Sequence, residues 1–386
     1  MTPRRRTMAW SAAVVVLAAA LLFGLRIRRD MVDFAVNYSA GDRLIHGETL
    51  YRTTDEHYQF KYSPFCAMIY APLALLSPTA AKAVWFFFVI AATAGLIILP
   101  ARLLSGPDGR LAQGAAIGAG LLLMKFIFRE IQLGQINAII TALLLLMILN
   151  LGNDETKRSP FRIIAAGLLW GLATALKPYA VIFLPYFILK RRWNILWPAL
   201  LVLGASLFAP AVYYGFAGNL TVHEEWISTL SRSTPGLLAS QDNVSILALL
   251  VKWTGDRGLS QPIYAFVVLL LAVFVYAFIR RGRGLPKALL PEAALLLLLI
   301  PLISPLGWDY TFISSVLAVA LLLQHFKDFP PLGRIILGAN LAVIAFALYD
   351  LLGRRLYAGF MTASVPTINF LLLAGFLAYL RRKRKA

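Results

Sequence analysis

Residues 28–64 read RRDMVDFAVNYSAGDRLIHGETLYRTTDEHYQFKYSP, and they form the longest polar interval in a chain that is otherwise mostly apolar. The interval follows the apolar segment 9–25 and ends where the next apolar run begins. Connections between neighbouring helices are commonly only a few residues long. An interval of this length therefore indicates more than a connector. Its acid Asp33 lies a few residues beyond the apolar segment, and the alternative interpretation of Asp33 is a solvated loop acid.

The composition around this interval is typical of an integral membrane protein. The chain has 386 residues, of which 60% are hydrophobic, and its mean hydropathy is +0.74. Only 14% of the residues are charged, whereas a soluble domain has about 25%. Many apolar runs approach the roughly 20 residues that a helix needs to cross a bilayer.

A net charge of +19 could indicate a nucleic-acid partner, but the distribution of the basic residues argues against one. Of the 37 Lys and Arg residues, 22 fall in short loops that we assign to one side of the membrane. These loops are 1–8, 101–112, 152–162, 190–193, 280–287, 326–334 and 381–386. Basic residues collect in cytoplasmic loops. We therefore expect these loops and both termini to be cytoplasmic, the basic tail to contact membrane lipids, and no nucleic acid to bind.

The apolar runs predict an all-α integral membrane protein with about twelve transmembrane helices. We expect one polytopic domain, 1–386, with an outer catalytic loop at 26–64 and a second outer loop at 217–261. The segment 65–76 and the apolar part of 240–250 are too short to cross, and we expect interfacial helices in the outer loops. The predicted spans are 9–25, 82–100, 113–128, 138–151, the two halves of 163–192, 194–216, 262–279, 288–303, 310–325, 335–352 and 366–380.

The segment 163–192 reads IIAAGLLWGLATALKPYAVIFLPYFILKRR and has basic residues at both ends. If both ends are cytoplasmic, the middle must turn. Pro178 disfavours helix at the residue before it, so we predict a break at Lys177 that places this cation near the outer surface. Gly167 and Gly171 have the spacing that lets two membrane helices pack closely.

Several polar residues that are unusual for their expected depth fall on the outer side. Each also has a simpler interpretation: Lys177 could extend to the interface, Asn137 and Asn243 could cap helices, and Trp308 could belong to an aromatic belt. Glu224 and Glu225 are interpreted as a solvated loop pair. The full set is Asp33, Arg129, Glu130, Gln135, Asn137, Lys177, Asn243, Trp308 and Asp309.

Motifs for nucleotide, metal and nucleophile chemistry are not found in the sequence. There is no phosphate-binding glycine loop, no dinucleotide fingerprint and no serine-nucleophile motif. Cys66 is the only cysteine, and the four histidines do not have metal-ligand spacing. We therefore expect no cofactor and no metal site.

Six motifs occur in an order that resembles glycosyltransferase family 87. They are DF-x(5)-AGDRLIHGETLY (33–51), FKYSPFCAMIYAPLALL (60–76), LGQIN (133–137), AGLLWGLATALKPY (166–179), NVSILAL (243–249) and SPLGWDY (304–310). The resemblance implies a GT-C fold and the transfer of mannose from a polyprenyl-phosphate sugar. The chain departs from the family at Tyr310, where the family often has histidine after Trp-Asp.

A sugar on a lipid monophosphate already carries a good leaving group and does not demand a divalent cation. Its transfer needs one carboxylate to take the acceptor proton and cations to stabilise the departing phosphate. By resemblance Asp33 is this base. Asp309 is a candidate substrate ligand and the reserve base, because it also falls on the expected outer side. Lys177, Arg129 and, more weakly, Arg29 are our phosphate ligands. The expected sugar ligands are Gln135, Asn137, Asn243 and Trp308.

We therefore expect an inverting glycosyltransferase at the outer face of the plasma membrane. It would move a hexose, mannose by resemblance, from a polyprenyl-phosphate sugar to a lipid-linked or cell-envelope glycan acceptor. A transporter or flippase of lipid-linked sugars is one alternative, which would place polar groups near the midplane. A polymerase or ligase of envelope polysaccharide is another, because it uses similar substrates.

Overall fold

The computed structural model describes residues 17, 20–105, 109–152, 159–282, 285 and 288–383. Within these ranges the chain is helical, and its β-pairing is a single isolated bridge between Asn243 and Trp308. The predicted all-α class is therefore confirmed. Most of the predicted first span, 9–25, lies outside the described residues, as do Met1, Arg158 and Ala386.

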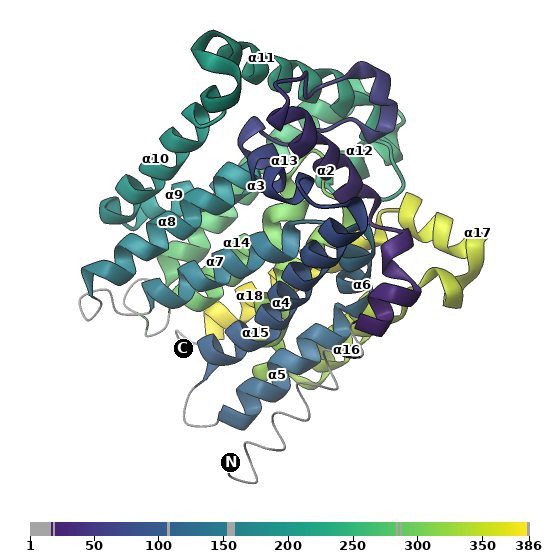
Figure 1. The fold of residues 1–386 in the computed structure, drawn as a ribbon. Helices are drawn as coiled ribbons and strands as arrows, with labels where there is room; N and C mark the ends of the chain where they lie inside the picture. The colour runs from purple at the N-terminus through teal and green to yellow at the C-terminus, as the bar shows by residue number, and fades with distance from the viewer. Residues whose placement is uncertain are drawn as a thin grey trace.

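Figure 1 shows the helices as one bundle, in which α2, α11 and α12 gather at the upper end of the view. Short 3₁₀ segments connect several of the α-helices. The α-helices are α2 (Val32–Ile45), α3 (Pro64–Ala74), α4 (Pro78–Leu104), α5 (Gly109–Leu122), α6 (Met124–Leu133), α7 (Asn137–Leu151), α8 (Pro160–Leu176), α9 (Phe183–Leu189), α10 (Trp193–Phe208), α11 (Ala211–Leu237), α12 (Ile246–Thr254), α13 (Arg257–Arg281), α14 (Leu289–Ile303), α15 (Val316–Gln324), α16 (Pro331–Phe346), α17 (Tyr349–Thr362) and α18 (Val365–Lys383). The 3₁₀ segments are η1 (Ile27–Arg29), η2 (Thr53–Tyr58), η4 (Pro178–Ile182), η5 (Asp309–Ser315) and η6 (Phe326–Asp328).

The centre of the bundle is α14, in which every residue from Leu289 to Leu302 is buried. A helix that is apolar on all sides belongs inside a bundle or a membrane, and α14 packs on η5, α15 and α18. By contrast α13 lies at the edge, with Phe266, Leu269 and Val273 exposed. Exposed apolar side chains on a long helix are expected where lipid is the solvent.

Two described helices, α4 and α13, are each long and apolar enough to cross a membrane. Three further pairs reach that length only together, and each is bent: α5 with α6 by 61°, α10 with α11 by 87°, and α16 with α17 by 101°. The helices therefore have the length and composition of a membrane protein. They give at most five clear spans among the described residues, so the predicted twelve are not confirmed.

The two segments that we predicted as outer loops are largely helical. The loop 26–64 contains α2, and the loop 217–261 contains most of α11. The interval between the predicted spans 113–128 and 138–151 is also covered in part by a helix, α6. These helices carry polar residues on one side, which made them resemble loops in the sequence. Gly215, with φ of 65°, bends α11 near its start.

The predicted break in 163–192 is confirmed. Lys177 has extended backbone angles, φ −143° and ψ 116°, between the end of α8 and the 3₁₀ segment that Pro178 begins. The close packing predicted for Gly167 and Gly171 is also present. A Cβ on Gly167 would lie 2.5 Å from the carbonyl oxygen of Ile195 in α10, and one on Gly171 would lie 2.9 Å from the Cα of Ala199.

A buried ion cluster at the N-terminal end of α14 joins this helix to α18 and to the segment after α9. Glu292 is 1% exposed and lies 2.9 Å from the Nζ of Lys190, which follows α9. Its other oxygen accepts a hydrogen bond from the guanidinium of Arg381 in α18. Arg381 is itself 3% exposed. The sequence placed Lys190 and Arg381 in cytoplasmic loops, but in the fold both serve a buried carboxylate.

Candidate active site

A cavity of about 890 Å³ opens among α2, the loop before α3, the α6–α7 turn, the break after α8, α11 and the α14–η5 turn. Four of the predicted site residues line it: Asp33, Gln135, Lys177 and Trp308. They come from segments far apart in the sequence. The fold thus brings four of the predicted site residues to one cavity.

Asp33 lies in the first turn of α2, where the positive end of the helix dipole favours a carboxylate. Its Oδ2 accepts a hydrogen bond from Nε2 of Gln135 at 2.5 Å. Burial raises the pKa of the Asp33 carboxyl, while the Gln135 hydrogen bond and the charges of Lys177, Arg129 and Lys61 lower it. A carboxylate with a raised pKa is a better proton acceptor than an ordinary surface aspartate.

Gln135 connects Asp33 to the opposite wall of the cavity. The chain reaches it through Gly134, which ends α6 in the left-handed region with φ of 70°. The Nε2 of Gln135 also donates to the phenol oxygen of Tyr310 at 3.1 Å, and its Oε1 accepts from the hydroxyl of Tyr62 at 2.9 Å. Tyr310, the departure from the family pattern, therefore contacts the group that holds Asp33.

Lys177 points into the cavity from the break after α8. Its Nζ donates to Oδ1 of Asn137 at 2.6 Å and lies 5.0 Å from the ring centre of Tyr62 and 5.6 Å from that of Tyr179. Burial lowers the pKa of Lys177 to about 8, and Glu130, Cys66 and Asp33 oppose that shift.

Lys61 is a second cavity cation, which the sequence analysis missed. Burial lowers its pKa, and the charge of Asp33 raises it. Among the described residues its Nζ has no hydrogen-bond or ion-pair partner, so this charge is available to a ligand. Its backbone carbonyl accepts a hydrogen bond from Nε1 of Trp226 in α11 at 3.1 Å. The signal was present in the FKYSP motif, where one cation stands between two aromatic residues.

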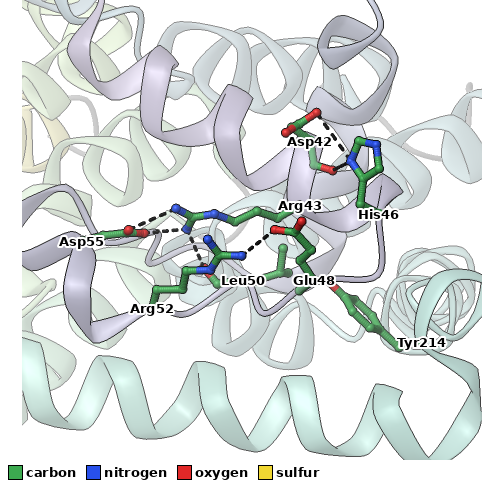
Figure 2. A network of polar contacts seen from close by, with 8 residues as sticks. All are labelled: Asp42, Arg43, His46, Glu48, Leu50, Arg52, Asp55 and Tyr214. Carbon is green, nitrogen blue, oxygen red and sulfur yellow. Dashed lines mark hydrogen bonds and ion pairs between the residues drawn. The ribbon is translucent and has the colours of Figure 1, made fainter.

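The loop that leads from α2 toward Lys61 is held by a network of charges. Figure 2 shows Arg43 reaching Asp55 and Arg52 reaching Glu48, with Tyr214 of α11 beside them. Arg43 makes two hydrogen bonds to Asp55, at 2.5 and 3.0 Å, and the Tyr214 hydroxyl donates to the carbonyl of Glu48 at 2.7 Å. Glu48 and Asp55 therefore have structural partners in this loop.

Arg129 and Asp309 lie outside the cavity lining and bind each other. The guanidinium of Arg129 donates to Asp309 at 2.7 Å and to Asp242 at 2.6 Å. Arg129 thereby ties α6 to η5 and to the loop before α12. Contact of Arg129 or Asp309 with substrate stays a prediction, and in this structure the guanidinium is occupied by two carboxylates.

The three remaining predicted ligands have different environments. Asn243 is buried and holds the 304–308 turn, donating to the carbonyl of Pro305 at 3.0 Å and accepting from the N–H of Gly307 at 3.1 Å. Asn137 is also buried and reaches the cavity through Lys177. Arg29 is exposed in η1 and does not line the cavity. Among the described residues no group of three His, Cys, Asp or Glu side chains is placed to hold a metal ion.

A comparison with known protein families matches the middle of the chain. The family model described as glycosyltransferase family 87 matches residues 60–305, which is more than half of the chain. The chain belongs to glycosyltransferase family 87. This family 87 protein is therefore a glycosyltransferase, and the resemblance seen in its sequence motifs is confirmed.

Two curated proteins are similar to this family 87 enzyme. Both are named polyprenol-phosphate-mannose-dependent alpha-(1-2)-phosphatidylinositol mannoside mannosyltransferase. The protein from Mycolicibacterium smegmatis is 26% identical over 353 residues, covering 83% of this chain and 77% of that protein. The protein from Mycobacterium tuberculosis is 27% identical over 282 residues, covering 68% of this chain and 62% of that protein.

One solved structure, ArnT from Cupriavidus metallidurans in the apo state, aligns with 98% of this family 87 enzyme and 73% of its own chain. The TM-score is 0.43 and the sequence identity 13%, a likeness too low to define a shared fold. The all-helical bundle is thus established by the structure itself, and the GT-C arrangement stays a prediction.

Proposed function

We propose that this enzyme transfers a mannosyl residue from a polyprenyl-phosphate donor to a lipid-linked acceptor, with inversion at the anomeric carbon. The observation that carries the proposal is the cavity, in which one carboxylate, Asp33, faces two cations, Lys61 and Lys177. The family and the names of the two relatives support the choice of donor and sugar.

The proposed reaction is a single displacement. Asp33 takes the proton of the acceptor hydroxyl as that oxygen bonds to the anomeric carbon. The bond between the anomeric carbon and the phosphate oxygen breaks at the same time, and its electron pair leaves with polyprenyl phosphate. Lys177 and Lys61 stabilise the charge that grows on the leaving phosphate. Gln135 holds Asp33, and Trp308 offers an aromatic wall to the sugar.

The names of the relatives and the chemistry of the cavity walls support the choice of acceptor class. Both relatives are named for a phosphatidylinositol mannoside acceptor. Val181, Leu230 and Leu237 give one side of the cavity an apolar wall, which suits a substrate carried on a lipid chain. A lipid-linked saccharide is therefore the proposed acceptor.

The proposed orientation places the cavity on the outer face of the plasma membrane, with the residues near both ends of the chain in the cytoplasm. The positive-inside distribution of Lys and Arg supports this orientation. The helices α2 and α11, which border the cavity, would then lie in the outer interface.

Incubating the purified enzyme in lipid nanodiscs with radiolabelled polyprenyl-phosphate mannose tests the proposal. Matched reactions contain phosphatidylinositol mannoside, a membrane lipid extract, or no acceptor, and each is repeated with Asp33→Asn. We expect a labelled glycolipid and released polyprenyl phosphate in the wild type with an acceptor. Transfer that is equal in wild type and Asp33→Asn contradicts the mechanism. Movement of the donor across liposome membranes without transfer would instead indicate a transporter.

A further inference from the structure

Glu130 lies in α6 beside the cavity but does not line it, and its side chain is buried at 1% exposure. Its Oε1 accepts a hydrogen bond from the backbone N–H of Ala138 at 2.8 Å. Its Oε2 accepts one from Nδ2 of Asn137 at 2.9 Å. Both oxygens accept from N–H donors, which is the arrangement of an ionised carboxylate, and such a group has no proton to donate.

The carboxylate fixes which way the Asn137 amide faces. A side-chain amide has a donor end and an acceptor end, and Glu130 requires the donor end. The Oδ1 of Asn137 then accepts from the Nζ of Lys177 at 2.6 Å and from the hydroxyl of Tyr179 at 3.2 Å. A reversed amide would set its NH₂ group against the Lys177 ammonium, which has only protons to offer.

The hydrogen bonds continue in the same direction from Asn137 to Asp33, the proposed base. The Nδ2 of Asn137 also donates to Oε1 of Gln135 at 3.3 Å, and Nε2 of Gln135 donates to Oδ2 of Asp33. Every donor in this chain therefore points from Lys177 toward Asp33. Hydrogen bonds that run in one direction polarise and strengthen one another.

We propose that Glu130 is a positioning residue for sugar transfer: it fixes the Asn137 amide, and through that amide it aligns both Lys177 and Asp33. This inference rests on the proposed function of the cavity. The competing interpretation gives Glu130 a structural role alone, as the acceptor for the first N–H groups of α7.

Glu130→Gln separates these interpretations because it keeps the size of the side chain and removes its acceptor-only character. One end of the new amide must present an NH₂ group to Ala138 or to Asn137, and the Asn137 amide can relieve this contact by turning over. We expect kcat/KM for the donor to fall by about 10–100-fold, the usual effect of losing a residue that orients another ligand. Asp256→Ala removes the cap of α13, an exposed hydrogen-bonding role with no link to the cavity, and should leave kcat/KM unchanged.

A double-mutant cycle tests whether Glu130 acts through Asn137. In the Asn137→Ala background the amide is already gone, so adding Glu130→Gln should change kcat/KM by less than about threefold. Residues that act through one network show such coupling, whereas independent effects add. Full additivity of the two substitutions would overturn the proposal.

The titration of Lys177 gives a readout that needs no sugar transfer. The rate at which its amine reacts with an amine-selective reagent, followed against pH by mass spectrometry, reports its pKa in each variant. The groups facing this amine are Glu130, Asp33, Cys66, Tyr62, Tyr179 and Asn137. Glu130→Gln should shift the reaction of Lys177 to lower pH, because the charge of Glu130 supports its protonated form.

The outcomes of these experiments test the role of Glu130 separately from the proposed substrate. An unchanged Lys177 titration in Glu130→Gln overturns the positioning role, whatever the enzyme transfers. A wild type that transfers no mannose, together with a shifted Lys177 titration, overturns the proposed substrate and leaves the electrostatic link between Glu130 and Lys177 supported.

Discussion

Lys177 donates a hydrogen bond from its Nζ to Oδ1 of Asn137 at 2.6 Å, inside the cavity and across 40 residues of sequence. A lysine that only extends to the membrane surface would place its ammonium in water. Instead, the rings of Tyr62 and Tyr179 pack around this ammonium and hold it on the side of the cavity where Asp33 lies. The relationship joins the proposed phosphate ligand to the network that holds the proposed base.

Asp33→Asn should fold, insert into the membrane and bind the donor, yet transfer sugar at least about 10²-fold more slowly, since a positioned general base contributes about 10²–10⁴-fold in rate. Asn keeps the size of the side chain but cannot accept the acceptor proton. The rate of labelled glycolipid formation is the measurement. Asp42→Asn is the matched control, because Asp42 lies in the same helix with its side chain 54% exposed. Near-wild-type turnover of Asp33→Asn would show that another group is the base.

Lys177→Ala should weaken donor binding, and Lys177→Arg should partly restore it, because arginine supplies a positive charge at the same position. Lys61→Ala should weaken donor binding as well, since the two ammonium groups share one phosphate in the proposed complex. Equilibrium binding of polyprenyl-phosphate mannose is the measurement, with exposed Lys327→Ala as the control. Equal affinities in wild type and both alanine variants would remove the lysines from the phosphate site.

The pH dependence of kcat/KM should have two limbs. Activity should fall as pH decreases through the raised pKa of Asp33, because the protonated carboxyl is no base. Activity should also fall as pH increases through about 8, where Lys177 loses its proton and its charge. Lys177→Arg should abolish the limb near 8. If the fall in kcat/KM near pH 8 persists in Lys177→Arg, another group causes it. Lys61→Arg then tests whether that group is Lys61, the second cation of the cavity.

Arg129→Leu should lower the apparent melting temperature of the purified enzyme, because it leaves the carboxylate of Asp309 buried without its partner. Breaking a buried ion pair in this way costs about 3–5 kcal/mol. Adding Asp309→Asn should recover part of the loss, since it removes the unpaired charge. Arg26→Leu, whose side chain is 74% exposed, is the control. If Arg129→Leu is as stable as the wild type but binds the donor more weakly, the predicted contact of Arg129 with the donor phosphate is supported.

Single-cysteine labelling can measure the orientation. On a Cys66→Ser background, a cysteine at Thr234, which lines the cavity, should react with a membrane-impermeant reagent added outside intact cells. A cysteine at Arg281, at the end of α13, should react only after the cells are opened. The opposite pattern would place the cavity in the cytoplasm.

The features that could be predicted from sequence depend on local rules. The break at Lys177 follows from Pro178, and the close approach of α8 to α10 follows from the spacing of two glycines. Asp33, Gln135 and Lys177 line one cavity, and the sequence had predicted them to lie on a common side of the membrane.

The features that were missed depend on distant partners. Arg129 looked like a free cation because its two carboxylates lie 113 and 180 residues away in the sequence. The opposite error concerned Lys61, whose Nζ has no hydrogen-bond or ion-pair partner among the described residues but which was not singled out from its motif. We predicted the bent helix α11 as a loop because its many polar residues obscure the helical spacing of its apolar residues in the sequence.

The buried cluster of Glu292 with Lys190 and Arg381 also bears on biosynthesis. Arg381 is translated 89 residues after Glu292, so a ribosome delivers the carboxylate to the membrane well before its strongest counter-charge exists. Lys190 is already present and can serve as an interim partner. The last helix then docks by adding a second cation to this cluster, so the burial of Glu292 is completed only when the end of the chain has been made.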